Sequence, residues 1–331
     1  MPDQLLFAGE VMLNGLMAGV LYALVALGFV LIFKASGIFN YAQGVMALFA
    51  AMTLVGIMNG QVPFSHLINS VFGTDIHDFG WTVPALAGIL LTLLVMIFLA
   101  WAVNRFVLRH LVGQEPIILF MATIGLAYFL EGVADLMWGS EIKALDVGIP
   151  QGGSIWIEEM TAGLGSPDFF GFFIDRLDIV ASVVAALLVV GLVLFSQYTK
   201  QGRALRAVAD DHQAALSVGI SLSFIWVLVW SIAGFVALVA GIMWGSKSGV
   251  QFSLSLIALK ALPVLMLGGF TSIPGAIVGG LIIGVGEKLF EFTLGGAIGG
   301  ATETWFAYML ALVFLVFRPQ GLFGERIIER V

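Results

Sequence analysis

The sequence predicts an all-α, polytopic transmembrane helical bundle of about 8–10 helices, some of them short or broken. Hydrophobic residues make up 60% of the 331-residue chain and charged residues only 11%, whereas soluble domains average about 45–50% apolar and about 25% charged residues. Stretches without Asp, Glu, Lys or Arg, such as 11–33 and 212–246, are long enough to cross a bilayer, which takes about 20 helical residues. The absence of cysteine excludes disulfides and thiolate chemistry.

Apolar segments bounded by loop signals supply the candidate crossings. Segment 257–270 is short and carries Lys260 and Pro263, and segment 41–58 follows the polar residue Asn40. Both are predicted to be broken or re-entrant helices, because interrupted apolar segments mark the central sites of transporters. The nine candidate crossings are 10–33, 41–58, 83–103, 117–138, 178–196, 222–244, 257–270, 275–291 and 303–317.

Basic residues gather in every second loop, which predicts the orientation through the positive-inside rule. The N-terminus is expected outside and the C-terminus in the cytoplasm, with loops 59–82 and 139–177 extracytoplasmic. No run of Lys and Arg resembles a nucleic-acid footprint, so no nucleic-acid partner is expected. Nine of the fourteen basic residues fall on the predicted cytoplasmic side: Lys34, Arg105, Arg109, Lys200, Arg203, Arg206, Arg318, Arg326 and Arg330.

The longest inward loop, 197–221, contains an alanine-rich stretch that predicts a helix over 203–217, with Gly219 suited to end it. Two interpretations remain open: a linker helix at the membrane surface, or a docking helix for a cytoplasmic partner. The residues spaced for one shallow apolar face are Ala204, Val208, Ala215 and Val218.

Glycines recur at small-xxx-small spacing, in the pairs Gly275/Gly279 and Gly280/Gly284. Such pairs let membrane helices approach closely, either within this chain or against a second membrane subunit. The dipeptide Gly-Lys does not occur, which excludes a P-loop. No catalytic constellation or metal-ligand spacing is found, so we expect neither catalysis nor a metal site.

Polar residues within or beside the crossings are functional candidates, because charges in a bilayer are costly. Lys260 is predicted to reach the membrane surface, to satisfy carbonyls freed by Pro263, or to contact the substrate. Asn40, Tyr41 and Gln43 either pack against a neighbouring helix or line the exit of a pathway. The acidic candidates near the predicted outer surface are Glu131, Asp135, Glu287 and Glu291.

Five stretches in a fixed order carry a resemblance to a known family. One of them is the loop from Gly202 to Ile220. Each stretch alone is moderately specific, and the five together in the family's order make the match strong. The chain resembles the LivH/LivM family of ABC transporter permeases, the branched-chain amino-acid import type, and is closer to the LivH branch. The other four stretches are Asn14 to Gly28, Asn40 to Gly44, Lys260 to Gly280, and Phe317 to Gly324.

This resemblance implies one transmembrane permease domain over 1–331 in the bacterial inner membrane. It implies a second, LivM-like permease, two cytoplasmic ATP-binding subunits that hold ATP and magnesium, and an extracytoplasmic substrate-binding protein. This chain would hold no cofactor and no ATPase site. The acidic candidates are either solvated or vestibule-lining helix ends, or they contact the binding protein or the substrate. Loop 197–221 would dock on the ATPase through Gly202, Arg203, Arg206, Asp210, Ala214, Ala215 and Gly219.

The resemblance favours branched-chain or other hydrophobic amino acids as substrates. Relatives that handle urea, amides or small carboxylates leave those classes open, as do two departures from the family pattern: Val45 where many members have an acid, and a long outward loop 139–177. A gradient-driven secondary transporter is the other alternative. It would need an acid deep in a crossing, whereas the acids here lie near the predicted ends.

Overall fold

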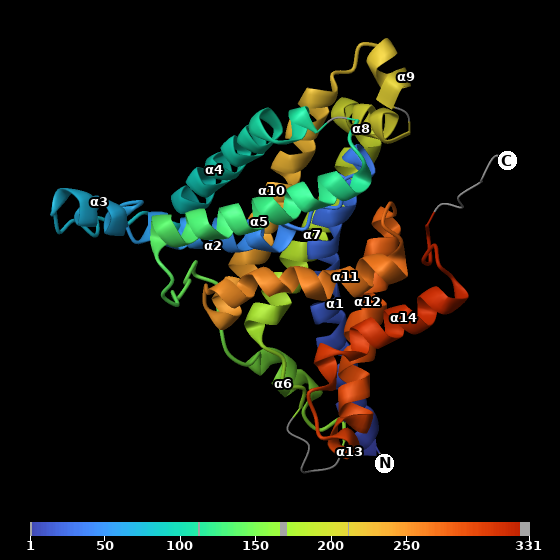
Figure 1. The fold of residues 1–331 in the computed structure, drawn as a ribbon. Coiled ribbons are helices and arrows are strands. Elements are labelled where there is room, and N and C mark those ends of the chain that lie inside the picture. Colours follow the sequence, from blue (N-terminus) through green and yellow to red (C-terminus); the bar gives the residue numbers. More distant parts are fainter. Residues whose placement is uncertain (1, 112, 166–170, 211, 325–331) are drawn as a thin grey trace. The chain divides into compact units, whose positions relative to one another are not determined.

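The computed structural model describes residues 2–111, 113–165, 171–210 and 212–324, and within these ranges it contains helices and isolated bridges but no strand (Figure 1). The all-α prediction is confirmed. Six described helices are long and apolar enough to cross a membrane. They are α1 (Pro2–Ser36), α4 (Ala85–Phe106), α5 (Pro116–Trp138), α7 (Arg176–Tyr198), α10 (Leu222–Ser248) and α12 (Ile273–Phe290).

Each of the nine candidate crossings coincides with a helix, but three of these helices are short: α2 (Gln43–Met58), α11 (Ile257–Gly268) and α14 (Phe306–Phe317). Two of them are the segments predicted to be broken. Helix α14 is shorter than predicted because Thr302–Thr304 forms a separate 3₁₀ turn, η4. The inside–outside orientation stays a prediction, and Arg326 and Arg330 lie outside the described residues.

The remaining elements are short. Loop 139–177 contains α6, and its residues 166–170 lie outside the described ranges. A π-helical turn, η3, continues α12. The bounds of the short elements are α3 (Ser65–Phe72), η1 (Leu108–His110), α6 (Ile155–Thr161), α8 (Lys200–Asp210), α9 (His212–Ser217), η2 (Phe252–Leu256), η3 (Glu291–Gly295) and α13 (Gly296–Ile298).

One compact unit, residues 31–148 with 191–258, is built around α2. Every residue from Gln43 to Gly56 is buried, and α2 packs against α4, α5, α10 and η2. A helix that is apolar on all sides is buried, either in a protein core or in a bilayer. The surrounding helices place the 16-residue α2 in the core of this unit, where it need not span a bilayer by itself. Gly44 is required at the start of α2, because a Cβ there would lie 2.7 Å from the Cβ of Ala258.

The other unit comprises the described parts of 1–30, 149–190 and 259–331. Its α1 and α12 touch backbone to backbone at glycines. A Cβ added to Gly19 would lie 2.6 Å from the carbonyl oxygen of Gly280, and one added to Gly280 would lie 2.6 Å from that of Gly19. Gly284 faces Gly15 in the same way. For the predicted pair Gly280/Gly284, the interpretation as packing within the chain is therefore confirmed.

We expect Gly280→Leu to separate α1 from α12 and to destabilise the protein, by about 1–3 kcal/mol or more, as overpacked cores do. The measurement is the thermal unfolding midpoint of the purified protein in detergent. Gly132→Leu on α5 is the matched control, because a Cβ at Gly132 meets no atom within 4 Å. Equal midpoints for the two variants would contradict the packing argument.

Candidate functional site

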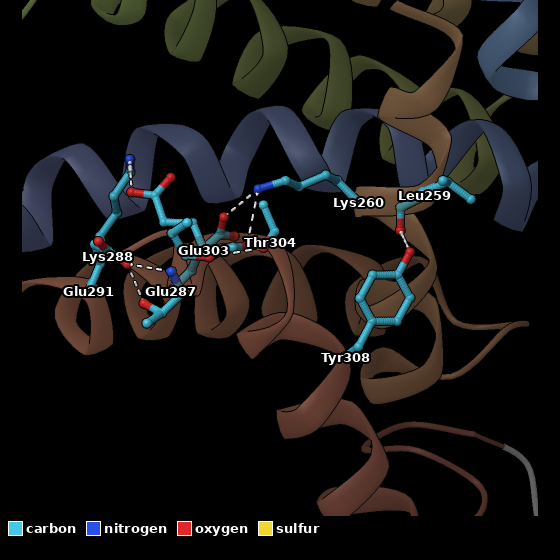
Figure 2. Close-up of polar contacts among 10 residues, drawn as sticks. Leu259, Lys260, Glu287, Lys288, Glu291, Glu303, Thr304 and Tyr308 are labelled. Carbon is cyan, nitrogen blue, oxygen red and sulfur yellow. Dashed lines mark hydrogen bonds and ion pairs between the residues drawn. The ribbon is translucent and has the colours of Figure 1, made fainter. Parts of the chain in front are cut away.

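Helix α11 contains Pro263, and a proline inside a helix leaves the carbonyl four residues earlier without its donor. That carbonyl belongs to Leu259. The hydroxyl of Tyr308, from α14, donates a hydrogen bond to it at 2.6 Å (Figure 2). The expectation that Lys260 would satisfy the freed carbonyl is therefore wrong, because a phenol from another helix fills this role.

Lys260 instead forms an ion pair with Glu287 of α12 (Figure 2). Its Nζ also donates to the backbone carbonyl of Glu303 at 3.3 Å and lies 5.6 Å from the ring centroid of Tyr22, on α1. The Glu287 side chain is 1% exposed and that of Lys260 is 31% exposed. Four segments that are distant in sequence thus meet around one ammonium group.

Because the Lys260–Glu287 ion pair is largely buried, the loss of either partner strongly affects the stability of the protein. Two charges taken out of water lose hydration, and their attraction compensates only when both partners are present. Removing one partner of such a pair typically costs about 3–5 kcal/mol. Glu287 points at Lys260 from a buried position, so its predicted contact with a binding protein gains no support from the geometry and stays a prediction.

Two further contacts hold the chain between α12 and α14. Lys288 pairs with the carboxylate of Glu303 at 2.7 Å, and Glu291 accepts hydrogen bonds from the backbone N–H of Thr302, at 2.7 Å, and from its hydroxyl. The sequence alone does not single out Glu303 or Thr302. The available signal was the spacing of charges three and four apart, with Glu287 and Lys288 on α12 and Glu291 at the start of η3, because such charges share a helix face that needs partners.

Asn40 and Gln43 are buried and hydrogen-bonded inside the unit built around α2. Asn40 donates to the side-chain oxygen of Gln43 at 3.3 Å, and Gln43 donates to the carbonyl of Ala233 on α10 at 3.2 Å. The backbone N–H of Tyr41 donates to the hydroxyl of Thr123 on α5 at 3.1 Å. The geometry favours the packing alternative for Asn40 and Gln43, whereas the Tyr41 side chain is exposed.

Loop 197–221 forms two helices, α8 and α9, where the sequence predicts one, and residue 211 between them lies outside the described residues. Gly219 ends α9 as predicted. Its φ is +86°, and the Gly219 and Ile220 N–H groups donate to the carbonyls of Leu216 and Ala215, both at 3.0 Å. A left-handed glycine that redirects the last N–H groups is the usual helix stop.

The apolar face of this loop differs from the predicted one. Gly202, Leu205 and Val208 are the buried residues of α8, whereas Val218 is 79% exposed. The prediction for Val218 is wrong because α9 ends at Ser217 and Val218 lies beyond the helix. Arg206 donates to the carbonyl of Gln197 at 3.3 Å. The loop candidates exposed to solvent are Arg203, Asp210, Ala214 and Gly219, and Ala215 is buried.

The long apolar helices, the buried short helix and the paired charges define a multi-pass integral membrane protein. A family model described as branched-chain amino acid transport system / permease component matches residues 11–318. The chain belongs to this family. The resemblance seen in the motifs is thereby confirmed, and the protein is a multi-pass permease component of the inner membrane.

Two relatives match the chain over nearly its full length, and a third matches about half of it. It is 29% identical to the high-affinity branched-chain amino acid transport system permease protein LivH of Salmonella typhimurium, over 100% of both chains. It is 29% identical to the corresponding BraD protein of Pseudomonas aeruginosa, over 97% of each. The fructose import permease protein FrcC of Rhizobium meliloti is 27% identical over 49% of this chain and 47% of its own.

Proposed function

We propose that this chain is a membrane-spanning subunit of an ATP-driven importer of branched-chain or other hydrophobic amino acids. Its partners are a second, LivM-like permease, two cytoplasmic ATP-binding subunits and an extracytoplasmic binding protein. The full-length similarity to proteins named as branched-chain amino acid permeases supports this substrate class. Urea, amides and small carboxylates are the alternative substrates that transport measurements must separate.

The observation that carries the ATP-driven mechanism is the placement of α8 and α9. Both helices pack against α10, and α10 itself packs against α2 and α4 in the same unit. A force applied to the loop therefore reaches a membrane-crossing helix and the buried α2. Alternating access needs such a connection, because this chain has no P-loop and the energy must come from another subunit.

The outer surface of α9 suits a docking role. Leu216, on α9, is 52% exposed, and Val218, which follows the helix, is 79% exposed. The residues beside them are small: Ala215, Ser217 and Gly219. Single exposed apolar side chains are common on protein surfaces, but here two lie at the end of a glycine-ended helix, in one of the five stretches that carry the family resemblance. This apolar surface supports docking over a solvated linker, and a linker helix at the membrane surface stays the alternative to docking.

The test is co-purification of the chain with the proteins encoded beside it, followed by ATPase measurements in lipid. We expect hydrolysis to rise when the binding protein is added with leucine, isoleucine or valine, and not with urea or fructose. Recovery of no ATPase, together with uptake that collapses when the ion gradient is dissipated, would establish a gradient-driven transporter instead. Stimulation by urea, amides or carboxylates alone would replace the amino-acid assignment.

A further inference from the structure

A cavity of about 640 Å³ lies in the unit built around α2. Its walls come from the segment after α2, from α3 and from the C-terminal end of α5 with the residues that follow. Small-molecule sites in proteins typically measure about 300–1,000 Å³, so this cavity has the size of a ligand site. Apart from the end of α5, these segments belong to loops 59–82 and 139–177, which the charge pattern predicts to be extracytoplasmic.

Lys143 is the cation on the cavity wall. Its Nζ donates to the side-chain oxygen of Gln61 and to the carbonyl of Trp138, both at 2.6 Å. Both acceptors are neutral, and an ammonium group has three N–H donors. Burial lowers the pKa of Lys143, and the nearby charge of Glu141 opposes that effect. A partly desolvated ammonium with neutral acceptors gains stability when an anion joins it.

Lys143 is also held in place before any ligand arrives. Its backbone N–H donates to the carbonyl of Val250 at 3.0 Å, and its carbonyl accepts from the Val250 N–H at 2.8 Å. A cation fixed by its backbone and by two side-chain hydrogen bonds loses little entropy when it binds a ligand.

The rest of the wall has two other properties. Glu141 and Asp135 provide negative charge, while Leu67, Leu136 and Met137 provide apolar surface. A free α-amino acid has matching parts: a carboxylate for a lysine, an ammonium for a carboxylate, and a side chain for an apolar wall. Urea and simple amides lack the charges, and small carboxylates lack the ammonium.

We propose that this cavity is a binding site on the permease for a free zwitterionic α-amino acid with an apolar side chain, in which Lys143 holds the carboxylate. The inference rests on the proposed function for its substrate class. In the predicted orientation, the site meets the substrate on the outer side before it crosses the membrane.

The test uses the purified permease complex in nanodiscs, without the binding protein, at about pH 7, where the α-amino groups of leucine and leucinamide are mostly protonated. We expect saturable leucine binding, at least about 10-fold weaker binding of leucinamide, which has no carboxylate, and a similar loss for leucine in Lys143→Met. Lys247→Met is the control, since it removes a lysine that does not line the cavity.

Absence of leucine binding, or equal binding of leucine and leucinamide by the wild-type complex, would overturn the proposal even if Lys143→Met failed to fold. If Lys143→Met bound leucine as tightly as the wild type does but bound the binding protein more weakly, the proposal would be overturned. Lys143 would then pair with an acidic side chain of the binding protein instead. ATPase stimulation by the binding protein with leucine is measured in parallel. If stimulation persists where leucine binding is absent, the site fails while the proposed function stands.

Discussion

Replacing Leu216 and Val218 together by aspartate is expected to abolish ATP-driven uptake while the protein still inserts and folds. Both side chains are exposed, at 52% and 79%, so charges there do not disturb the packing of α9 on α10. They would, however, place two carboxylates in the apolar contact proposed with the ATPase, and desolvated unpaired charges are costly. The measurement is leucine uptake by cells, with the amount of membrane-inserted protein determined by immunoblot.

The matched control is the double variant Leu216→Met/Val218→Ile, which keeps the surface apolar and should retain uptake. The purified aspartate variant should also lose its ATPase subunits during co-purification. Normal uptake by the aspartate variant would refute the docking assignment and leave α8 and α9 as a surface linker.

Lys260→Met is expected to be among the most destabilising single substitutions in the chain. It leaves Glu287, whose side chain is 1% exposed, without its cation, and the loss of one partner of a buried pair costs about 3–5 kcal/mol. The double variant Lys260→Met/Glu287→Met removes both charges and should recover most of that stability. Thermal unfolding midpoints of Lys260→Met, Glu287→Met, the double variant and the wild type form a double-mutant cycle.

Leucine uptake by the same variants separates two roles for the pair. We expect the double variant to regain uptake with stability, as a structural ion pair requires. A double variant that is stable and inserted but does not transport would place Lys260 and Glu287 on the substrate pathway. Additive losses in the cycle would show that the two charges do not interact in the membrane.

Local patterns in the sequence were sufficient to locate the nine helices and the end of α9, because apolar run length and a left-handed glycine depend on neighbouring residues alone. The sequence predicted that α12 packs closely against another helix, but not that this helix is α1. The spacing of Gly280 and Gly284 indicates close packing, but the partner helix lies more than 250 residues earlier, at Gly15 and Gly19.

The charged network was not predictable from spacing. Lys260 and Glu287 are separated by 27 residues, and their pairing depends on how α11 is placed against α12. Pro263 predicts that the Leu259 carbonyl lacks its helical hydrogen-bond donor. The sequence does not say which hydroxyl or amine group donates to that carbonyl instead. The cavity beside Lys143 is a similar case, since it depends on the backbone pairing of Lys143 with Val250.

The hydrogen bond from Tyr308 to Leu259 makes the residue at position 308 depend on the residue at position 263. A chain with another residue at position 263 would close its own helical hydrogen bond to the Leu259 carbonyl, and the phenol would then face an acceptor already in use. A chain with phenylalanine at position 308 would leave the proline gap open. Positions 263 and 308 should therefore covary among related sequences: a chain that keeps the proline should also keep the tyrosine.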